Sequence, residues 1–379
     1  MHEREDPSAD SDQDGARERA LILALARGET NDERLQILVA GIDIELLIQQ
    51  LTGLKLLGLL GQRLLERAPG MLGASFAEAV ERVVSAGRRD SLDQLMATWR
   101  LLRLLERRGV VALPLKGPFF AERLLGDPGL RLSKDIDLLV SIRDIKAATA
   151  VLEGIGYVRP RVSDALPKLH HIFQLEGGPD VELHWRVHWY ETEFAEEMLG
   201  RSVLDGDARR PAPADELVML LLIHARDGLQ GLRAPLDVGA WWSLYHGRVE
   251  GPDIHAILGR HPALGPPVAA SATAIQRLLG VPITALLPPG RFARRTQLAV
   301  RLAGWSATPL DPDVDTTAKV VDALLTPRGG FREFVGRAVF PPLLGSRATR
   351  PLRQVIYAAG FARRTTRVVK RLRSTRHST

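Results

Sequence analysis

The spacing of apolar residues divides the chain into helical and strand-like stretches. Between residues 17 and 108, apolar side chains recur at three- and four-residue intervals, which places them on one face of an α-helix. The clearest runs are Leu56, Leu57, Leu59, Leu60, Leu64 and Leu65, then Leu92, Leu95, Met96, Trp99, Leu102 and Leu105. We therefore predict an N-terminal region of amphipathic helices with these side chains on their apolar faces.

The pattern changes between residues 109 and 190, where short apolar runs alternate with helical spacing. We predict strands over 110–115, 135–140, 171–175 and 181–187, and helices over 119–125 and 142–154. Pro114 must lie near the end of its strand, because proline has no amide hydrogen for a sheet. Strands mixed with short helices predict a small α/β core.

Helical spacing returns after Pro211, which predicts a C-terminal helical domain over residues 191–345. Helices are expected over 216–225, with Asp215 as N-cap, and over 236–245, 268–279 and 292–302, with a loop at 309–312. The fold class is α+β, with a small mixed β-sheet flanked by N-terminal and C-terminal helical regions. Residues 1–16 have almost no apolar surface and are predicted to form a disordered tail.

Composition and charge narrow the possibilities. The 379 residues include no cysteine, which excludes disulfides and thiolate metal sites. The richest apolar run is 217–223, far short of the roughly 20 residues of a membrane span, so we expect a soluble protein, and the absence of cysteine fits a cytoplasmic one. The net charge is +6, and residues 347–379 hold ten Lys or Arg and no acid. A basic tail over 346–379 can bind an anionic partner, or can be a solvated helix end.

Two aspartates stand at the start of the predicted strand 135–140. Side chains alternate along a strand, so Asp135 and Asp137 share one face, with Cα atoms roughly 6.5 Å apart. Two carboxylates on one face can hold a hard cation such as Mg²⁺ or Mn²⁺. The competing interpretation is an acidic strand end that faces water, because Asp-x-Asp alone is a weak motif.

Basic residues surround these aspartates in the sequence. Lys116 and Gly117 follow the strand 110–115, where a glycine lets backbone amides approach a phosphate and the lysine adds positive charge. Arg131 and Lys134 are further candidates for phosphate binding. Cations beside paired carboxylates are what a metal–triphosphate site needs. Alternatively, Arg131 and Lys134 only neutralise the two aspartates.

A third acid comes from the strand 181–187, on which Glu182 and His184 share one face. Glu182 could complete a three-carboxylate metal site or act as a base toward a hydroxyl, and Asp180 competes for this role. His184 could orient Glu182 or a phosphate, bind metal, or be structural. Zinc bound by His184 and His188 is disfavoured, because their four-residue spacing shares a face only on a helix.

Taken in order, these motifs resemble the uncharacterised nucleotidyltransferase family within the DNA polymerase β-like superfamily. The matching residues are Leu115-Lys116-Gly117, Asp127-Pro128-Gly129-Leu130-Arg131, Asp135-Ile136-Asp137-Leu138-Leu139-Val140, Gly156-Tyr157, Glu182-Leu183-His184-Trp185, His224 and Asp237. The resemblance covers about residues 90 to 250. It implies transfer of a nucleoside monophosphate from an NTP to a hydroxyl-type acceptor, with release of pyrophosphate.

The resemblance also implies roles for particular residues. Asp135, Asp137 and Glu182 would be the catalytic metal ligands, with Mg²⁺ or Mn²⁺ as cofactor and an NTP, ATP by preference, as substrate. The residues expected to bind the nucleotide are Lys116, Gly117, Arg131, Lys134, His184 and His224. His224 has an alternative role as an ordinary residue at a helix end.

The chain departs from the superfamily pattern at three points. Lys116-Gly117 replaces the usual Gly-Ser or Gly-Gly of the phosphate loop, the gap from Gly117 to Asp135 is long, and Glu182 stands where Asp is more common. Members of the family look to be found near genes for ribosomally made peptides, including lasso peptides. That implies a peptide or small molecule as acceptor, with RNA as a further candidate.

Two other functions compete with nucleotidyl transfer. One is a nucleotide- or RNA-binding adaptor whose catalytic function has decayed and whose basic C-terminus makes the contact, which predicts salt-sensitive binding without a metal. The other is kinase-like phosphotransfer, because the same ion geometry serves both reactions.

Overall fold

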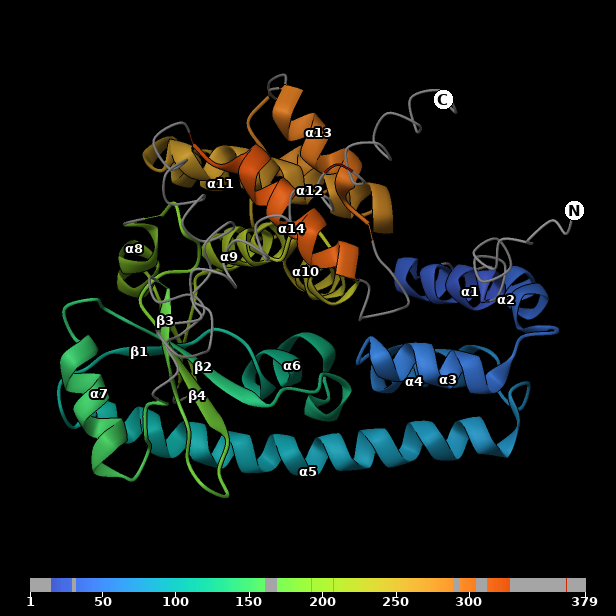
Figure 1. Ribbon diagram of the computed structural model, residues 1–379, viewed down its shortest axis with the longest axis horizontal. Helices are drawn as coiled ribbons and strands as arrows, with labels where there is room; N and C mark the ends of the chain where they lie inside the picture. The colour runs from blue at the N-terminus through green and yellow to red at the C-terminus, as the bar shows by residue number, and fades with distance from the viewer. Residues whose placement is uncertain are drawn as a thin grey trace, which may run out of the picture.

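A computed structural model describes residues 15–28, 32–160, 169–191, 193–206, 208–289, 294–304, 312–327 and 366. The predicted disordered and basic tails lie outside these residues, except that Gly15 and Ala16 are described at the start of the first helix and residue 366 is described alone. The N-terminal region is helical, as predicted (Figure 1). Its elements are α1 (Ala16–Arg27), α2 (Asp32–Val39), α3 (Ile44–Gly53), α4 (Leu57–Arg67) and α5 (Gly73–Glu106).

The predicted α/β core is present; the strand over 135–140 has the predicted bounds, and the other three strands are shorter than expected. Its elements are β1 (Ala112–Pro114), α6 (Pro118–Leu125), the 3-10 turn η1 (Pro128–Leu130), β2 (Asp135–Val140), α7 (Ile145–Gly154), β3 (His170–Phe173) and β4 (Asp180–His184). The strand order is β1-β2-β4-β3, in which β2 and β4 are parallel and the outer strands pair antiparallel. Pro114 ends β1, as predicted. This mixed sheet between helical regions confirms the α+β class.

The two faces of β2 have different environments. Ile136, Leu138 and Val140 belong to a buried cluster that includes Leu101 of α5 and Leu152 of α7. Figure 1 shows α5 running beneath the sheet, with α7 beside it. The opposite face of β2, which carries the two aspartates, therefore points away from α5 and α7.

The C-terminal region is mostly helical but contains a hairpin that was not predicted. Its elements are α8 (Phe194–Gly200), β5 (Val203–Asp205), β6 (Ala208–Arg210), α9 (Pro213–Arg226), α10 (Arg233–Tyr245), α11 (Gly251–Arg260), η2 (Pro262–Leu264), α12 (Gly265–Leu279), η3 (Ile283–Leu286), α13 (Arg294–Leu302) and α14 (Pro312–Leu325). The four predicted helices correspond to α9, α10, α12 and α13, whereas α8, α11 and α14 were not predicted.

Two local predictions in this region were wrong. Of the loop predicted over 309–312, residues 309–311 lie outside the described residues, and Pro312 begins α14; proline is favoured at the first position of a helix because its missing amide hydrogen is not needed there. Asp215 is not the N-cap of α9, because the helix already begins at Pro213. Asp215 is buried instead and accepts hydrogen bonds of 3.0 and 2.8 Å from Arg201.

The N-terminal and C-terminal helices share one hydrophobic core. Leu21 of α1 and Leu60 of α4 belong to the same buried cluster as Leu220 of α9 and Ile275 of α12. Figure 1 shows α1 beside the C-terminal helices and α4 between α1 and α5. The N-terminal helices therefore pack against the rest of the molecule, around the same core that supports the sheet.

The buried face of α5 differs from the predicted one. Leu92 and Met96 are 58% and 65% exposed, and polar residues take the buried positions beside them. Ser91 Oγ and Gln94 Nε2 donate hydrogen bonds of 3.0 Å to backbone carbonyls of the segment between α6 and β2. That segment is irregular and needs hydrogen-bond donors, so it selects a polar stripe of α5 over the more apolar one.

Candidate active site

The sheet brings three carboxylates together. Asp137 on β2 is the register partner of Glu182 on β4, and Asp135 lies on the same face of β2. One oxygen from each carboxylate lies within 4.8 Å of the others. Hard divalent cations take oxygen ligands in such an arrangement, so these residues fit Mg²⁺ or Mn²⁺. Asp180, the competing third acid, pairs in register with Asp135 and is not in this group.

Asp137 is the most enclosed of the three acids, with 2% exposure. Lys116 Nζ and His184 Nε2 each lie 3.1 Å from its Oδ1. Burial by itself would raise the pKa of Asp137, but the attraction of Lys116 and the hydrogen bond to His184 outweigh burial and hold the pKa well below its ordinary value. The carboxylate is therefore ionised and available as a ligand at neutral pH.

His184 connects two of the three carboxylates. Its ring is buried, and Nε2 lies 3.1 Å from Asp137 and 3.2 Å from Glu182. Burial would raise the pKa of Glu182, and the hydrogen bond to His184 lowers it overall. His170 packs edge-on against His184, and His170, Glu182 and His184 form a second group with metal-ligand geometry. At these distances His184 can orient both carboxylates or serve as a metal ligand.

A cleft opens over the two aspartates. It holds about 760 Å³ of space free of atoms, open solvent included. The residues that line it are Lys55, Lys116, Arg131, Ser133, Lys134, Asp135, Asp137, Leu220, Ile223, Asp227, Arg233, Ala234 and Asp237. These residues come from the N-terminal helices, the sheet and the C-terminal helices, so the cleft lies where all three meet.

The predicted phosphate-binding residues have different surroundings. Lys116 and Lys134 line the cleft. Gly117 has φ 86° and ψ −154°, a conformation that glycine alone adopts readily, and it precedes α6 as its N-cap. Arg131 is buried and donates two hydrogen bonds of 2.9 Å to Asp237 of α10. Its partner is therefore neither of the two aspartates of β2.

His224 does not join the other predicted site residues. It is buried in α9, and its Nδ1 lies 2.9 Å from Ser271 Oγ of α12. Burial lowers the pKa of His224 to about 3, so the ring is neutral. His224 lines a separate cavity together with residues of α12 and α13, and it does not line the cleft over the aspartates.

A family model described as "Uncharacterised nucleotidyltransferase" matches residues 40–280, more than half of the chain. The chain belongs to this nucleotidyltransferase family. The match begins within the N-terminal helices and ends after α12, so it includes the residues that line the cleft. No curated protein and no solved structure matches the chain. The resemblance found in the motifs is thereby confirmed, and the protein is a transferase of nucleotidyl groups.

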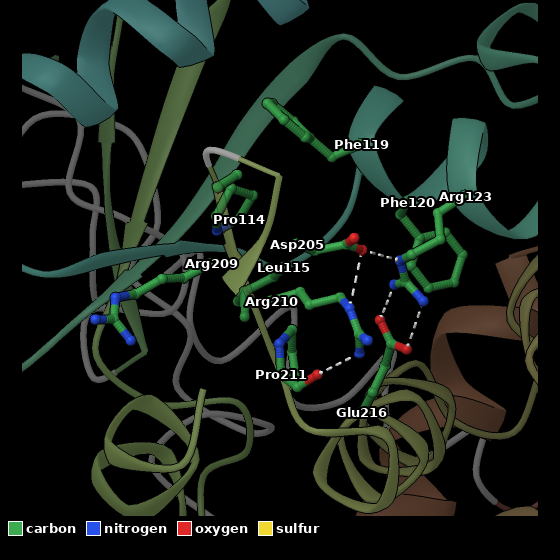
Figure 2. Close-up of a pocket in the computed structure, with 11 residues that line it drawn as sticks. Pro114, Leu115, Phe119, Phe120, Arg123, Asp205, Arg209, Arg210, Pro211 and Glu216 are labelled. Atoms are coloured by element: carbon green, nitrogen blue, oxygen red, sulfur yellow. Dashed lines mark hydrogen bonds and ion pairs between the residues drawn. The ribbon is translucent and has the colours of Figure 1, made fainter. Parts of the chain in front are cut away.

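A second hollow in the nucleotidyltransferase lies between α6, the β5–β6 hairpin and α9 (Figure 2). Its centre is occupied by charged side chains that bind one another. Arg123 forms hydrogen bonds with both carboxylate oxygens of Glu216 and with Tyr245 Oη, and Arg210 Nε donates to Asp205 at 2.9 Å. These groups are already paired, so they hold the hairpin against the helices.

Two basic residues that line the cleft were not identified from the sequence. Lys55 comes from the junction of α3 and α4, and Arg233 begins α10. The Arg233 guanidinium donates to the carbonyl of Leu132, 101 residues away, and burial lowers the pKa of Arg233. A contact over such a separation leaves no local sequence pattern. In the sequence, the resemblance of His224 and Asp237 to the family was the one feature that connected the later helices with the site.

Within the described residues, no single helix of the nucleotidyltransferase has the length and apolar composition to cross a membrane. The segments Glu33–Val39 and Ile44–Gly53 reach the required length and composition only together, and they meet at an angle of 103°.

Proposed function

We propose that this nucleotidyltransferase uses Mg²⁺ or Mn²⁺, bound by Asp135, Asp137 and Glu182, to transfer a nucleoside monophosphate from an NTP to a hydroxyl-type acceptor. ATP is the expected nucleotide, and a peptide or small molecule is the expected acceptor. The observation that carries the proposal is the convergence of three carboxylates at a cleft lined with basic side chains.

The chemistry requires charge neutralisation and alignment. The acceptor oxygen attacks the α-phosphorus, the bond to the β-phosphate oxygen breaks, and pyrophosphate leaves while the hydroxyl proton passes to a base. Divalent cations supply stabilisation of the attacking and leaving oxygens in such a displacement. Lys116 and Lys134 lie where they can bind the phosphates, and His184 orients Asp137 and Glu182.

The test is turnover of the four α-³²P-labelled NTPs with Mg²⁺ in the presence of host cell extract. Wild type should label an acceptor, and the Asp135→Asn/Asp137→Asn variant should fold but lose activity by roughly 1000-fold, because several kcal/mol of transition-state stabilisation is removed. Asp180→Asn is the matched control, since Asp180 is an acid of the same sheet outside the carboxylate group. It should retain activity.

Three outcomes contradict the proposal. One is full activity of the double Asn variant. Another is the absence of labelled product with every NTP, together with metal-independent binding of nucleotide or RNA, which favours the adaptor hypothesis. The third is label that is transferred from γ-³²P-ATP and not from α-³²P-ATP, which indicates phosphotransfer.

A further inference from the structure

Lys55 has an unusual backbone conformation at the junction of α3 and α4. Its φ is 57°, and among the described residues only Lys55 and Leu229 have a positive φ without being glycine. The Lys55 amide donates to Thr52 at 2.9 Å, and the Leu56 amide donates to Leu51 at 2.8 Å. These two bonds form a Schellman motif, in which the left-handed position is most often glycine because a Cβ is disfavoured there.

Packing explains the left-handed conformation of Leu229 but not the choice of lysine at position 55. The Leu229 side chain is buried at 1% exposure, so it contributes to the core. Lys55 is exposed, whereas its neighbour Leu56 is buried at 3%. The backbone is therefore held in place beside the core while the lysine side chain extends into the cleft. Residues held in unfavourable conformations are concentrated at functional sites.

The other basic residues of the cleft differ in what they bind. Lys116 pairs with Asp137, Arg131 pairs with Asp237, and Arg233 donates to a backbone carbonyl. Within the described part of the chain, Lys55 and Lys134 form no ion pair at 4.0 Å or less. Two ammonium groups are thus available for an anionic ligand, one from the N-terminal helices and one from the segment before β2.

We propose that Lys55 binds the polyphosphate of the NTP, so that the N-terminal helices form part of the nucleotide site. The inference rests on the proposed function and adds a residue to it. An ammonium group forms charge-assisted hydrogen bonds with phosphate oxygens, and such bonds are stronger than those between neutral groups. The charge on Lys55 then accounts for lysine at a position where the backbone favours glycine.

The backbone at position 55 allows a variant that separates binding from folding. Lys55→Gly removes the charge and supplies the residue that suits the motif, so its melting temperature should equal or exceed that of wild type. Its kcat/KM for the NTP should fall by roughly 10- to 100-fold, the effect of losing a hydrogen bond to a charged group. Lys55→Arg should stay within about threefold of wild type, because it keeps the charge.

Lys146→Ala is the matched control for the loss of one positive charge. Lys146 is exposed on α7 and does not line the cleft, so its kcat/KM should be unchanged at about 0.1 M salt, where distant charges are screened. Calorimetric titration with Mg-ATP and with AMP gives a readout without turnover. Lys55→Gly should weaken Mg-ATP binding about tenfold and leave AMP binding within about twofold of wild type.

These measurements distinguish failure of the inference from failure of the proposed function. If wild type transfers label and Lys55→Gly has an unchanged kcat/KM for the NTP, or is altered only in its KM for the acceptor, the role of Lys55 is overturned and the proposed function stands. If wild type transfers no label, the proposed function falls, and the titration alone then decides whether Lys55 binds polyphosphate.

Discussion

The pKa values of two buried carboxyl groups, Asp137 and Glu191, are shifted from their ordinary values in opposite directions. Asp137 lies beside Lys116 and His184, and their attraction lowers its pKa in spite of burial. Glu191 is 2% exposed, and burial raises its pKa to about 7 although two backbone amides donate to it. The contacts of Lys116 and His184 therefore outweigh burial at Asp137, whereas the two backbone amides do not outweigh burial at Glu191.

The raised pKa of Glu191 predicts a pH-dependent contribution to stability. Between pH 4.5 and about 7 the folded state keeps the proton that the unfolded chain has lost, so this contribution declines as the pH rises through that window. Glu191→Gln does not ionise. The free energy of unfolding of Glu191→Gln minus that of wild type should therefore be about 2–3 kcal/mol larger at pH 8 than at pH 5.

Urea unfolding of both proteins at the two pH values measures this difference. Glu45→Gln on the exposed face of α3 controls for the removal of one surface carboxylate. A stability difference between Glu191→Gln and wild type that is the same at pH 5 and pH 8 would contradict a raised pKa for Glu191.

At the scale of elements, α5 and the turn η1 approach each other through glycine. A Cβ built on Gly129 would lie 2.7 Å from the carbonyl oxygen of Val84, and one built on Gly87 would lie 2.6 Å from the carbonyl oxygen of Gly129. Neither contact can be relieved by a flexible side chain. Asp127 secures the turn by accepting the Gly129 amide at 2.8 Å. The Asp127-Pro128-Gly129 motif thus positions the segment that leads to Arg131.

Gly129→Ala should separate α5 from η1 and lower the free energy of unfolding by about 1–3 kcal/mol, as overpacking does in other cores. Because η1 leads directly to Arg131 and the cleft, the KM of the Gly129→Ala variant for the NTP should also rise. Gly259→Ala is the control: nothing lies within 4 Å of its Cβ, and alanine suits a helix, so stability should stay equal or increase by about 0.5–1 kcal/mol. Equal denaturation midpoints for the two variants would refute the close approach.

At the scale of the whole molecule, a buried ion pair joins the segment before β2 to the C-terminal helices. Arg131 precedes β2, and Asp237 lies in α10, 106 residues later. Arg131 also lies over the ring of Phe120 in α6, with 5.2 Å between the guanidinium and the ring centre. These contacts fix the position of the segment before β2 relative to α6 and α10.

Asp237→Ala should lower the free energy of unfolding by about 3–5 kcal/mol, because it leaves the Arg131 charge buried without a partner. The double variant Arg131→Met/Asp237→Leu removes both charges and should be more stable than the single variant. Chemical denaturation of the three proteins tests this expectation. A double variant no more stable than Asp237→Ala would show that the pair contributes more than charge compensation.

The sequence by itself determined the elements whose pattern is local. Alternation with a period of two placed Asp135 and Asp137 on one face of β2, because a strand has that period whatever surrounds it. Helical spacing likewise predicted α9, α10 and α12. The polar stripe of α5 was missed, because its hydrogen bonds go to a segment that is distant in sequence.

Only the tertiary structure decided which distant residues meet. Glu182 joins the aspartates through the parallel register of β4 with β2, Arg131 is bound by Asp237, and His224 turns toward Ser271. Lys55 enters the cleft because the N-terminal helices pack on the same core as the C-terminal ones. Such contacts depend on how whole elements pack, and no periodicity within a single segment records them.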